Sequence, residues 1–151
     1  MPHLSLNSPV GRLTIVEENG FITALIWGGK AAEPGDATPL LRRAKREICA
    51  YFAGKRQEFD LPIKPNGKPS EIKVWQAMAA IPYGQTRTYG DIAKAIGLNA
   101  RAVGRACSRN PVPILLPCHR VVAADGLGGF SAPGGSDWKG KLLVLERALL
   151  L

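Results

Sequence analysis

The sequence predicts an α+β protein with a small N-terminal domain of β-sheet plus helix, followed by a mostly helical C-terminal domain. Three observations lead to this prediction. Short alternating segments rich in β-branched residues fill positions 4–27, and apolar residues recur at helical spacing from position 39 onward. Between two regions of different character, "KPNGKPS" at 64–70 has the prolines and glycine of a linker. We therefore place the domains at 1–65 and 66–151.

The N-terminal domain is expected to hold a sheet and one helix. Two turn sequences, "NSPVG" and "ENG", separate three expected strands at 4–8, 11–18 and 21–27. The helix is expected over 39–54, with Thr38 as its N-cap. A further strand is expected at 58–63, and Cys49 is expected to pack in the core rather than to react.

The C-terminal domain reads as a series of short helices. One is expected over 70–81 with Ser70 as its N-cap, and another over 137–150 at the end of the chain. Between them, Thr88 is placed to cap "YGDIAKAIG", and after a three-residue turn "ARAVGRACSRN" continues as helix. Two short helices joined in this way indicate a helix-turn-helix.

The second helix of that pair carries a basic stripe. Arg101, Arg105 and Arg109 are spaced four apart and share one helix face, with small residues such as Ala102 between them. The chain has a formal net charge of +8, which favours a polyanionic partner such as nucleic acid. A slim basic helix could enter a nucleic-acid groove, although a solvated basic face on a core helix remains the open alternative.

"PCHRVV" at 117–122 places a cysteine beside a histidine and an arginine, after the apolar run "PVPILL". A thiol reacts as its thiolate, so Cys118 would need a base such as His119 and a third group to orient that base. Glu146 lies in the apolar run "LLVLE", where a carboxylate needs a partner. A relay of these three residues is one interpretation, and a buried cysteine that merely precedes two polar residues is the other.

The number and spacing of cysteines and histidines argue against a disulfide-stabilised protein and against a metal-binding protein. The three cysteines are widely spaced, which argues against a disulfide framework and for a reducing, cytoplasmic setting. With two histidines and no CxxC pair, no metal site is expected, and Cys107 is expected to be a packing residue. The sequence shows neither a secretory signal nor a run of apolar residues long enough to span a membrane.

Several blocks of the sequence resemble the O6-alkylguanine-DNA alkyltransferases, also called methylated-DNA–protein-cysteine methyltransferases. "RNPVPILLPCHRVV" is similar to the signature of that family, and "IPYGQTRTYGDIAKAIG", "ARAVGRA" and "GGFSAPGG…KLLVLE" resemble its other blocks in the same order. The resemblance covers about positions 70–147 and extends more weakly to "SPVGRLTIVEENGFITALIWG" in the N-terminal part.

The resemblance implies a set of catalytic roles. Cys118 would be the alkyl acceptor, His119 would deprotonate it through a water, and Glu146 would hold His119. Asn110 would brace the active-site turn by hydrogen bonds. Tyr89 would help to rotate the damaged nucleotide out of the duplex and could protonate the departing guanine.

The resemblance also implies how DNA is held. Arg101 would enter the duplex in place of the extruded base, with its helix, including Ala102 and Arg105, in the minor groove. Ser70 and Ala124 would contact backbone phosphates through their main-chain amides. The wall of the substrate pocket would be formed by Leu127, Gly128, Phe130 and Ser131.

The function implied is DNA repair by direct damage reversal, in which one alkyl group, chiefly methyl, moves irreversibly from O6 of guanine to Cys118. O4 of alkylated thymine is a second position from which the group could be transferred to Cys118. No cofactor is expected, the partner is alkylated double-stranded DNA rather than a membrane, and the protein is expected to be a cytoplasmic, nucleoid-associated monomer of bacterial type. The alternatives are a non-catalytic sensor or regulator of alkylated DNA and a cysteine hydrolase that regenerates its thiol.

Overall fold

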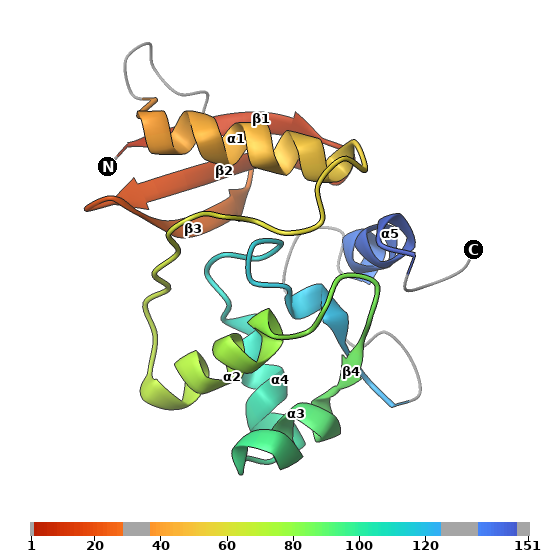
Figure 1. Ribbon diagram of the computed structural model, residues 1–151. Coiled ribbons are helices and arrows are strands. Elements are labelled where there is room, and N and C mark those ends of the chain that lie inside the picture. Colours follow the sequence, from red (N-terminus) through yellow and green to blue (C-terminus); the bar gives the residue numbers. More distant parts are fainter. Residues whose placement is uncertain (1, 29–36, 125–135, 148–151) are drawn as a thin grey trace. The chain divides into compact units, whose positions relative to one another are not determined.

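The computed structural model describes residues 2–28, 37–124 and 136–147. The chain divides into two compact units, Met1–Asn66 and Gly67–Leu151, and each is treated separately (Figure 1). The division falls within the linker-like segment 64–70. The first unit holds a sheet and a helix and the second is mostly helical, which is the predicted α+β class.

Three antiparallel strands form the sheet of the first unit, in the order β1 (His3–Ser8), β2 (Gly11–Glu18) and β3 (Phe21–Trp27). The three predicted strands are therefore present, and the first begins one residue earlier than expected. Asn19 and Gly20, between β2 and β3, both have positive φ. A tight hairpin turn that follows the strand twist needs this conformation, and Asn-Gly is the residue pair that adopts it most easily.

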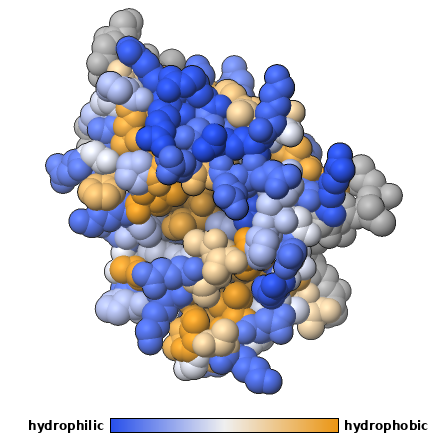
Figure 2. All heavy atoms as spheres, in the orientation of Figure 1, coloured by the Kyte–Doolittle hydropathy of each residue, from blue (hydrophilic) through white to orange (hydrophobic). Residues whose placement is uncertain are grey.

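Helix α1 (Pro39–Phe52) lies across the sheet (Figure 1) and buries an apolar face that includes Leu41, Ile48 and Tyr51. As predicted, the Thr38 side chain accepts a hydrogen bond from the Leu41 amide at 3.1 Å. The outer face of α1 is hydrophilic (Figure 2). Cys49 is exposed, so its expected core position is wrong, because it follows Arg42, Lys45 and Arg46 at helical spacing on that outer face.

The strand expected at 58–63 is absent from the described structure. Only an isolated bridge joins Ile22 to Ile63, with hydrogen bonds from the Ile22 amide to the Pro62 carbonyl (2.8 Å) and from the Lys64 amide to the Ile22 carbonyl (3.0 Å). Pro62 has no amide hydrogen and cannot extend a ladder of hydrogen bonds. The segment instead is fastened to α1, where the buried Glu47 carboxylate accepts a hydrogen bond from the Asp60 amide at 2.9 Å.

The second unit contains the predicted helix-turn-helix, formed by α3 (Tyr89–Ile96) and α4 (Ala100–Ser108). Thr88 and Asp91 cap α3 reciprocally, each side chain accepting the other residue's backbone amide at 3.0 Å. Gly97 ends α3 with a φ of 74°, a conformation that glycine adopts without steric cost. The Asn99 side chain then starts α4 by accepting the Ala102 amide at 2.8 Å.

Helix α2 (Pro69–Ala79) begins earlier than predicted. Its N-cap is Lys68, so Ser70 lies inside the first turn and the predicted N-cap is wrong. Proline is favoured at the first helical position because its missing amide hydrogen would have no helical partner there. The Glu71 carboxylate accepts the Lys68 amide at 2.9 Å and holds this start in place.

Four further elements of this unit either were not predicted from the sequence or end earlier than predicted. The strands β4 (Arg87–Thr88) and β5 (Val121–Val122) pair in parallel, and the 3₁₀ turn η1 (Cys118–Arg120) directly precedes β5. Helix α5 (Ser136–Leu145) is shorter at its C-terminal end than predicted, so Glu146 lies in the turn that follows it. Positive φ at Arg147 marks this helix end.

Substitution of Gly67 by alanine is expected to lower the free energy of unfolding by about 1–3 kcal/mol, measured by urea denaturation. A Cβ atom at Gly67 would lie 2.3 Å from the Trp75 ring. That ring is 1% exposed and its indole nitrogen donates a hydrogen bond to the Ala106 carbonyl at 2.9 Å, so it cannot move away freely.

Gly104→Ala is the matched control for this substitution. Gly104 lies inside α4, and a Cβ atom there would meet nothing within 4 Å. Its replacement should leave stability unchanged or raise it by up to about 1 kcal/mol, because alanine favours helix. Equal effects of the two substitutions would contradict the steric explanation.

Candidate active site

Cys118 opens the 3₁₀ turn η1 and is buried, as are the two residues that follow it. In an extended strand His119 and Arg120 would point to opposite faces. The tight turn instead lets both side chains reach the same carboxylate, that of Glu146 at the end of α5. The structure thus brings together three residues that the sequence analysis grouped, and it adds a fourth, Arg120.

His119 and Glu146 form the central contact of the site. The His119 Nε2 and Glu146 Oε2 atoms are 2.6 Å apart, and both side chains are completely buried. Because an ionised carboxylate can only accept, Nε2 carries the proton of a neutral imidazole and donates it to Glu146. His119 Nδ1 is then unprotonated, and it has no hydrogen-bond partner among the described residues.

Burial lowers the pKa of His119, against the effect of the Glu146 hydrogen bond and charge, which raise it. The charges of Arg120 and Lys139 lower that pKa further. The imidazole is therefore neutral at neutral pH, which is the form that can accept a proton.

The Cys118 thiol is protonated at rest. Burial raises its pKa to about 11, while a hydrogen bond with Asn110 and the charge of Lys139 act in the opposite direction. A thiol with such a pKa is a poor nucleophile unless a base removes its proton as it reacts. The unprotonated Nδ1 of the adjacent His119 is a suitable base.

Asn110 holds the loop that leads to Cys118. Its side-chain amide donates to the Leu116 carbonyl at 2.8 Å, and its carbonyl oxygen accepts the Val112 amide at 3.0 Å. Within this loop Ile114 has a φ of 73°, which is strained for a β-branched residue and persists only where the surroundings impose it. The Asn110 hydrogen bonds are part of those surroundings.

Tyr89 lies at the first position of α3 and meets a residue that sequence reasoning missed. The Lys139 ammonium is 3.5 Å from the Tyr89 hydroxyl. Burial lowers the pKa of Lys139 to about 8. Burial also raises the pKa of Tyr89 to about 12, so its hydroxyl stays protonated. The spacing offers a signal for Lys139: it precedes Glu146 by seven residues, and a helix expected over 137–150 would place the two on one face.

Cys107 behaves as the packing residue that was expected. It is buried on α4 with its sulfur 3.6 Å from that of Met78, and burial raises its pKa to about 12.

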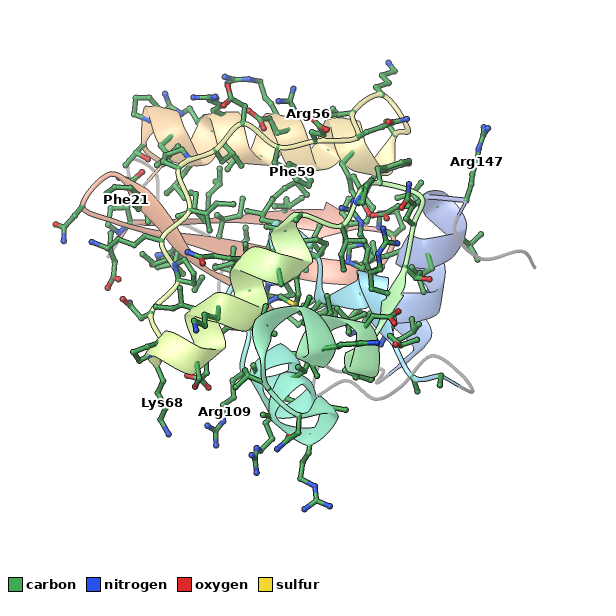
Figure 3. All side chains as sticks on the ribbon, turned by 60° about the horizontal axis from the view of Figure 1, so that its bottom comes forward. Phe21, Arg56, Phe59, Lys68, Arg109 and Arg147 are labelled. Atoms are coloured by element: carbon green, nitrogen blue, oxygen red, sulfur yellow. The ribbon has the colours of Figure 1, made fainter. Side chains whose placement is uncertain are left out.

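The predicted DNA-contacting residues of α2 and α4 meet at one groove. The groove has a volume of about 310 Å³ and is lined by Lys68, Ser70, Glu71, Leu98, Ala102, Arg105, Ala106 and Arg109. Arg109 forms an ion pair with Glu71 at 3.4 Å, yet its side chain is 60% exposed. Figure 3 shows Lys68 and Arg109 pointing away from the helices into solvent.

The remaining predicted residues lie apart from this groove or outside the described structure. Arg101 and Ala124 are exposed, at the start of α4 and just after β5. The expected pocket wall of Leu127, Gly128, Phe130 and Ser131 lies outside the described residues. Among the residues that are described, no cluster of side chains could hold a metal ion, and no helix is long and apolar enough to cross a membrane.

The fold and the site together define a class: a helix-turn-helix protein with a buried cysteine next to a histidine–glutamate pair. Comparison with known families gives the same result. Residues 69–148 match the model of the 6-O-methylguanine DNA methyltransferase DNA-binding domain, and residues 3–65 match the ribonuclease-like domain of the same proteins. The chain belongs to the 6-O-methylguanine DNA methyltransferase family, as the motifs predicted.

Individual relatives agree over nearly the whole chain. The constitutive methylated-DNA–protein-cysteine methyltransferase of Bacillus subtilis (strain 168) is 39% identical, covering 96% of this chain and 94% of the relative. The methylated-DNA–protein-cysteine methyltransferase of Methanosarcina barkeri is 49% identical, covering 93% of this chain and 94% of the relative. The crystal structure of Mycobacterium tuberculosis O6-methylguanine methyltransferase is similar with a TM-score of 0.85 at 38% identity, covering 99% of this chain and 94% of that one. The M. tuberculosis protein has also been crystallised in complex with DNA, and that structure has a TM-score of 0.84 and 38% identity, covering 97% and 93%.

Proposed function

We propose that this chain repairs alkylated DNA by direct damage reversal, with Cys118 accepting an alkyl group, chiefly methyl, from O6 of guanine. The observation that carries the proposal is the His119–Glu146 contact of 2.6 Å, which leaves an unprotonated Nδ1 on the residue that directly follows the buried Cys118. Membership of the methyltransferase family supplies the substrate class, and the DNA complex of a 38% identical relative supports DNA as the partner.

In the proposed reaction the Cys118 thiol gives its proton to His119 Nδ1 through a bridging water. Glu146 stabilises the imidazolium that forms. The thiolate sulfur attacks the alkyl carbon, an S–C bond forms, and the C–O bond to guanine breaks. The departing guanine takes the bond's electron pair and a proton from the Tyr89 hydroxyl, whose position beside Lys139 suits that transfer.

The product state explains why each molecule would act once. The alkyl group ends in a thioether on Cys118, and a thioether has no easy hydrolytic reversal. The sulfur itself is the acceptor, so the reaction as written needs no cofactor. A cysteine hydrolase, by contrast, would form an ester-like intermediate, require an oxyanion hole and recover its thiol.

Access to a guanine inside a duplex requires that the nucleotide be rotated out, which costs a few kcal/mol. We propose that α4 binds in the minor groove, that Arg101 fills the space left by the base, and that Arg105 and Ala102 lie against the DNA. Ser70 and Ala124 would contact phosphates through backbone amides. The extruded base would then meet the wall formed by Leu127, Gly128, Phe130 and Ser131.

A non-catalytic sensor of alkylated DNA is the other function that fits the basic helix. Such a protein would not need a buried histidine–glutamate pair beside a cysteine. Burying these ionisable groups costs free energy, so their presence favours a catalytic role. We therefore favour the methyltransferase. Its place of action would be the cytoplasm, on the nucleoid.

Incubation with a molar excess of a duplex containing labelled O6-methylguanine tests the proposal. Peptide mass spectrometry should find one methyl group per protein, on Cys118. Binding without transfer would support the sensor instead. Turnover beyond one equivalent would indicate an enzyme that regenerates its thiol.

Arg101→Ala is expected to slow repair of O6-methylguanine in a duplex much more than reaction with the free modified base. The wedge is needed only when a base must leave the stack, a step that costs a few kcal/mol. Single-turnover rates at saturating protein measure both reactions. Arg46→Ala is the control, since it removes an exposed arginine on the outer face of α1, outside the proposed DNA-binding groove, and should change the two rates equally. Equal slowing of both reactions by Arg101→Ala would contradict the wedge role.

A further inference from the structure

We infer that Arg120 is a positioning residue that keeps the His119 imidazole able to accept the proton of Cys118. The inference rests on the proposed function and assigns the residue that follows the cysteine and histidine in "PCHRVV". Arg120 acts on the reaction through Glu146 and His119 rather than by touching the alkyl group.

Arg120 is held in one orientation by three hydrogen bonds. Its Nε donates to Glu146 Oε1 at 2.8 Å and its Nη2 donates to Glu146 Oε2 at 3.1 Å, a two-point contact with the carboxylate. Its Nη1 donates to the Ile81 carbonyl at 2.8 Å. The Arg120 side chain is only 9% exposed, so this is a desolvated, charge-assisted contact rather than a surface ion pair.

The turn that follows Ile81 closes over this contact. The Arg120 guanidinium lies 5.8 Å from the centre of the Tyr83 ring, and the Tyr83 hydroxyl donates to the Leu145 carbonyl at 3.3 Å. Gly84 has a φ of 82°, and a Cβ atom there would lie 3.3 Å from the Glu146 carbonyl oxygen. The turn is thus fastened to the end of α5, and the guanidinium, the carboxylate and the imidazole cannot separate without disturbing it.

The charges in this cluster decide the protonation of His119. Glu146 Oε2 is shared between His119 Nε2 and Arg120 Nη2. An arginine remains protonated in proteins, so its charge already compensates the buried carboxylate and no imidazolium is required. The charge of Lys139 on α5, like that of Arg120, lowers the pKa of His119. Tyr83 stays neutral, because burial and the Glu146 charge raise its pKa.

Removing the Arg120 charge reverses this balance. The buried carboxylate would then draw its compensation from His119, which would hold a proton on each ring nitrogen. A doubly protonated imidazole cannot take the Cys118 proton. The variant would therefore be inactive at pH values at which the wild-type protein reacts, and it would regain activity once the imidazolium loses its proton.

The experiment is the pH–rate profile of single-turnover methyl transfer for Arg120→Met and Arg120→Lys. For Arg120→Met the acid limb should move to higher pH by about one unit or more, with the rate recovering at alkaline pH. Arg120→Lys keeps a charge near Glu146 without the two-point geometry, so its acid limb should lie near that of the wild type. A loss by the same factor at every pH, or equal shifts in both variants, would overturn the inference.

A second measurement needs no substitution of Arg120. The chain has two histidines, His3 and His119, so ¹⁵N imidazole resonances can be assigned by comparison with a His3→Gln protein. At neutral pH His119 should be neutral with its proton on Nε2, and a charged imidazolium there would overturn the inference even if Arg120→Met fails to fold. If the wild-type protein transferred no methyl group, the proposed function would be wrong. If it did, and the acid limb of Arg120→Met were unshifted, only the role of Arg120 would be wrong.

Discussion

Cys118→Ser is expected to abolish methyl transfer, by a factor on the order of 10⁴ or more, while DNA binding is unchanged. A hydroxyl is a much weaker acid than a thiol, so the neutral imidazole of His119 cannot deprotonate it to a useful extent. Oxygen replaces sulfur at a buried position of similar shape, so the DNA-binding helices should be unaffected. Single-turnover transfer and fluorescence anisotropy with the same methylated duplex measure the two properties.

The other cysteines serve as matched controls. Cys107→Ser changes a thiol that is also buried but packs against Met78, and Cys49→Ser changes an exposed thiol on α1. Both variants should retain transfer to Cys118. Methyl transfer that survives Cys118→Ser, or a methyl group found on Cys107, would show that the acceptor has been assigned wrongly.

Glu146→Ala is expected to lower the free energy of unfolding by about 3–5 kcal/mol and to slow methyl transfer strongly. The substitution leaves the Arg120 guanidinium buried without the carboxylate that it contacts at 2.8 Å and 3.1 Å. It also removes the acceptor that fixes the proton of His119 on Nε2. Urea denaturation and single-turnover transfer give the two effects.

Arg109→Ala is the comparison for stability, because it breaks an ion pair whose arginine is largely exposed. That pair with Glu71 should contribute about 0–1 kcal/mol. If Glu146→Ala cost no more than Arg109→Ala, the cluster around Glu146 would have to be hydrated in solution rather than desolvated as its burial indicates.

Local sequence signals predicted most of the secondary structure. Strand alternation, helical periodicity and the caps Thr38 and Thr88 all act within a few residues, so they can be recognised without knowledge of the fold. The errors arose where two local signals compete. Pro69 displaced the helix start from Ser70 to Lys68, and Pro62 prevented a strand at 58–63.

Only part of the candidate site was predicted from the sequence. Cys118 and His119 are adjacent, and Glu146 could be singled out because a carboxylate among leucines needs a partner. Arg120 and Lys139 were missed as parts of the cluster. A positive residue in a sequence is usually a surface residue, and only the packing of η1 against α5 buries these two.

By itself, the sequence determined which groups are available: a cysteine followed by histidine and arginine, a glutamate in an apolar run, and a basic helix in a helix-turn-helix. The tertiary structure alone decided their protonation states. The His119–Glu146 and Arg120–Glu146 contacts join residues 27 and 26 positions apart. Proton affinity depends on burial and on such partners, and neither is set until the 3₁₀ turn at Cys118 packs against the end of α5.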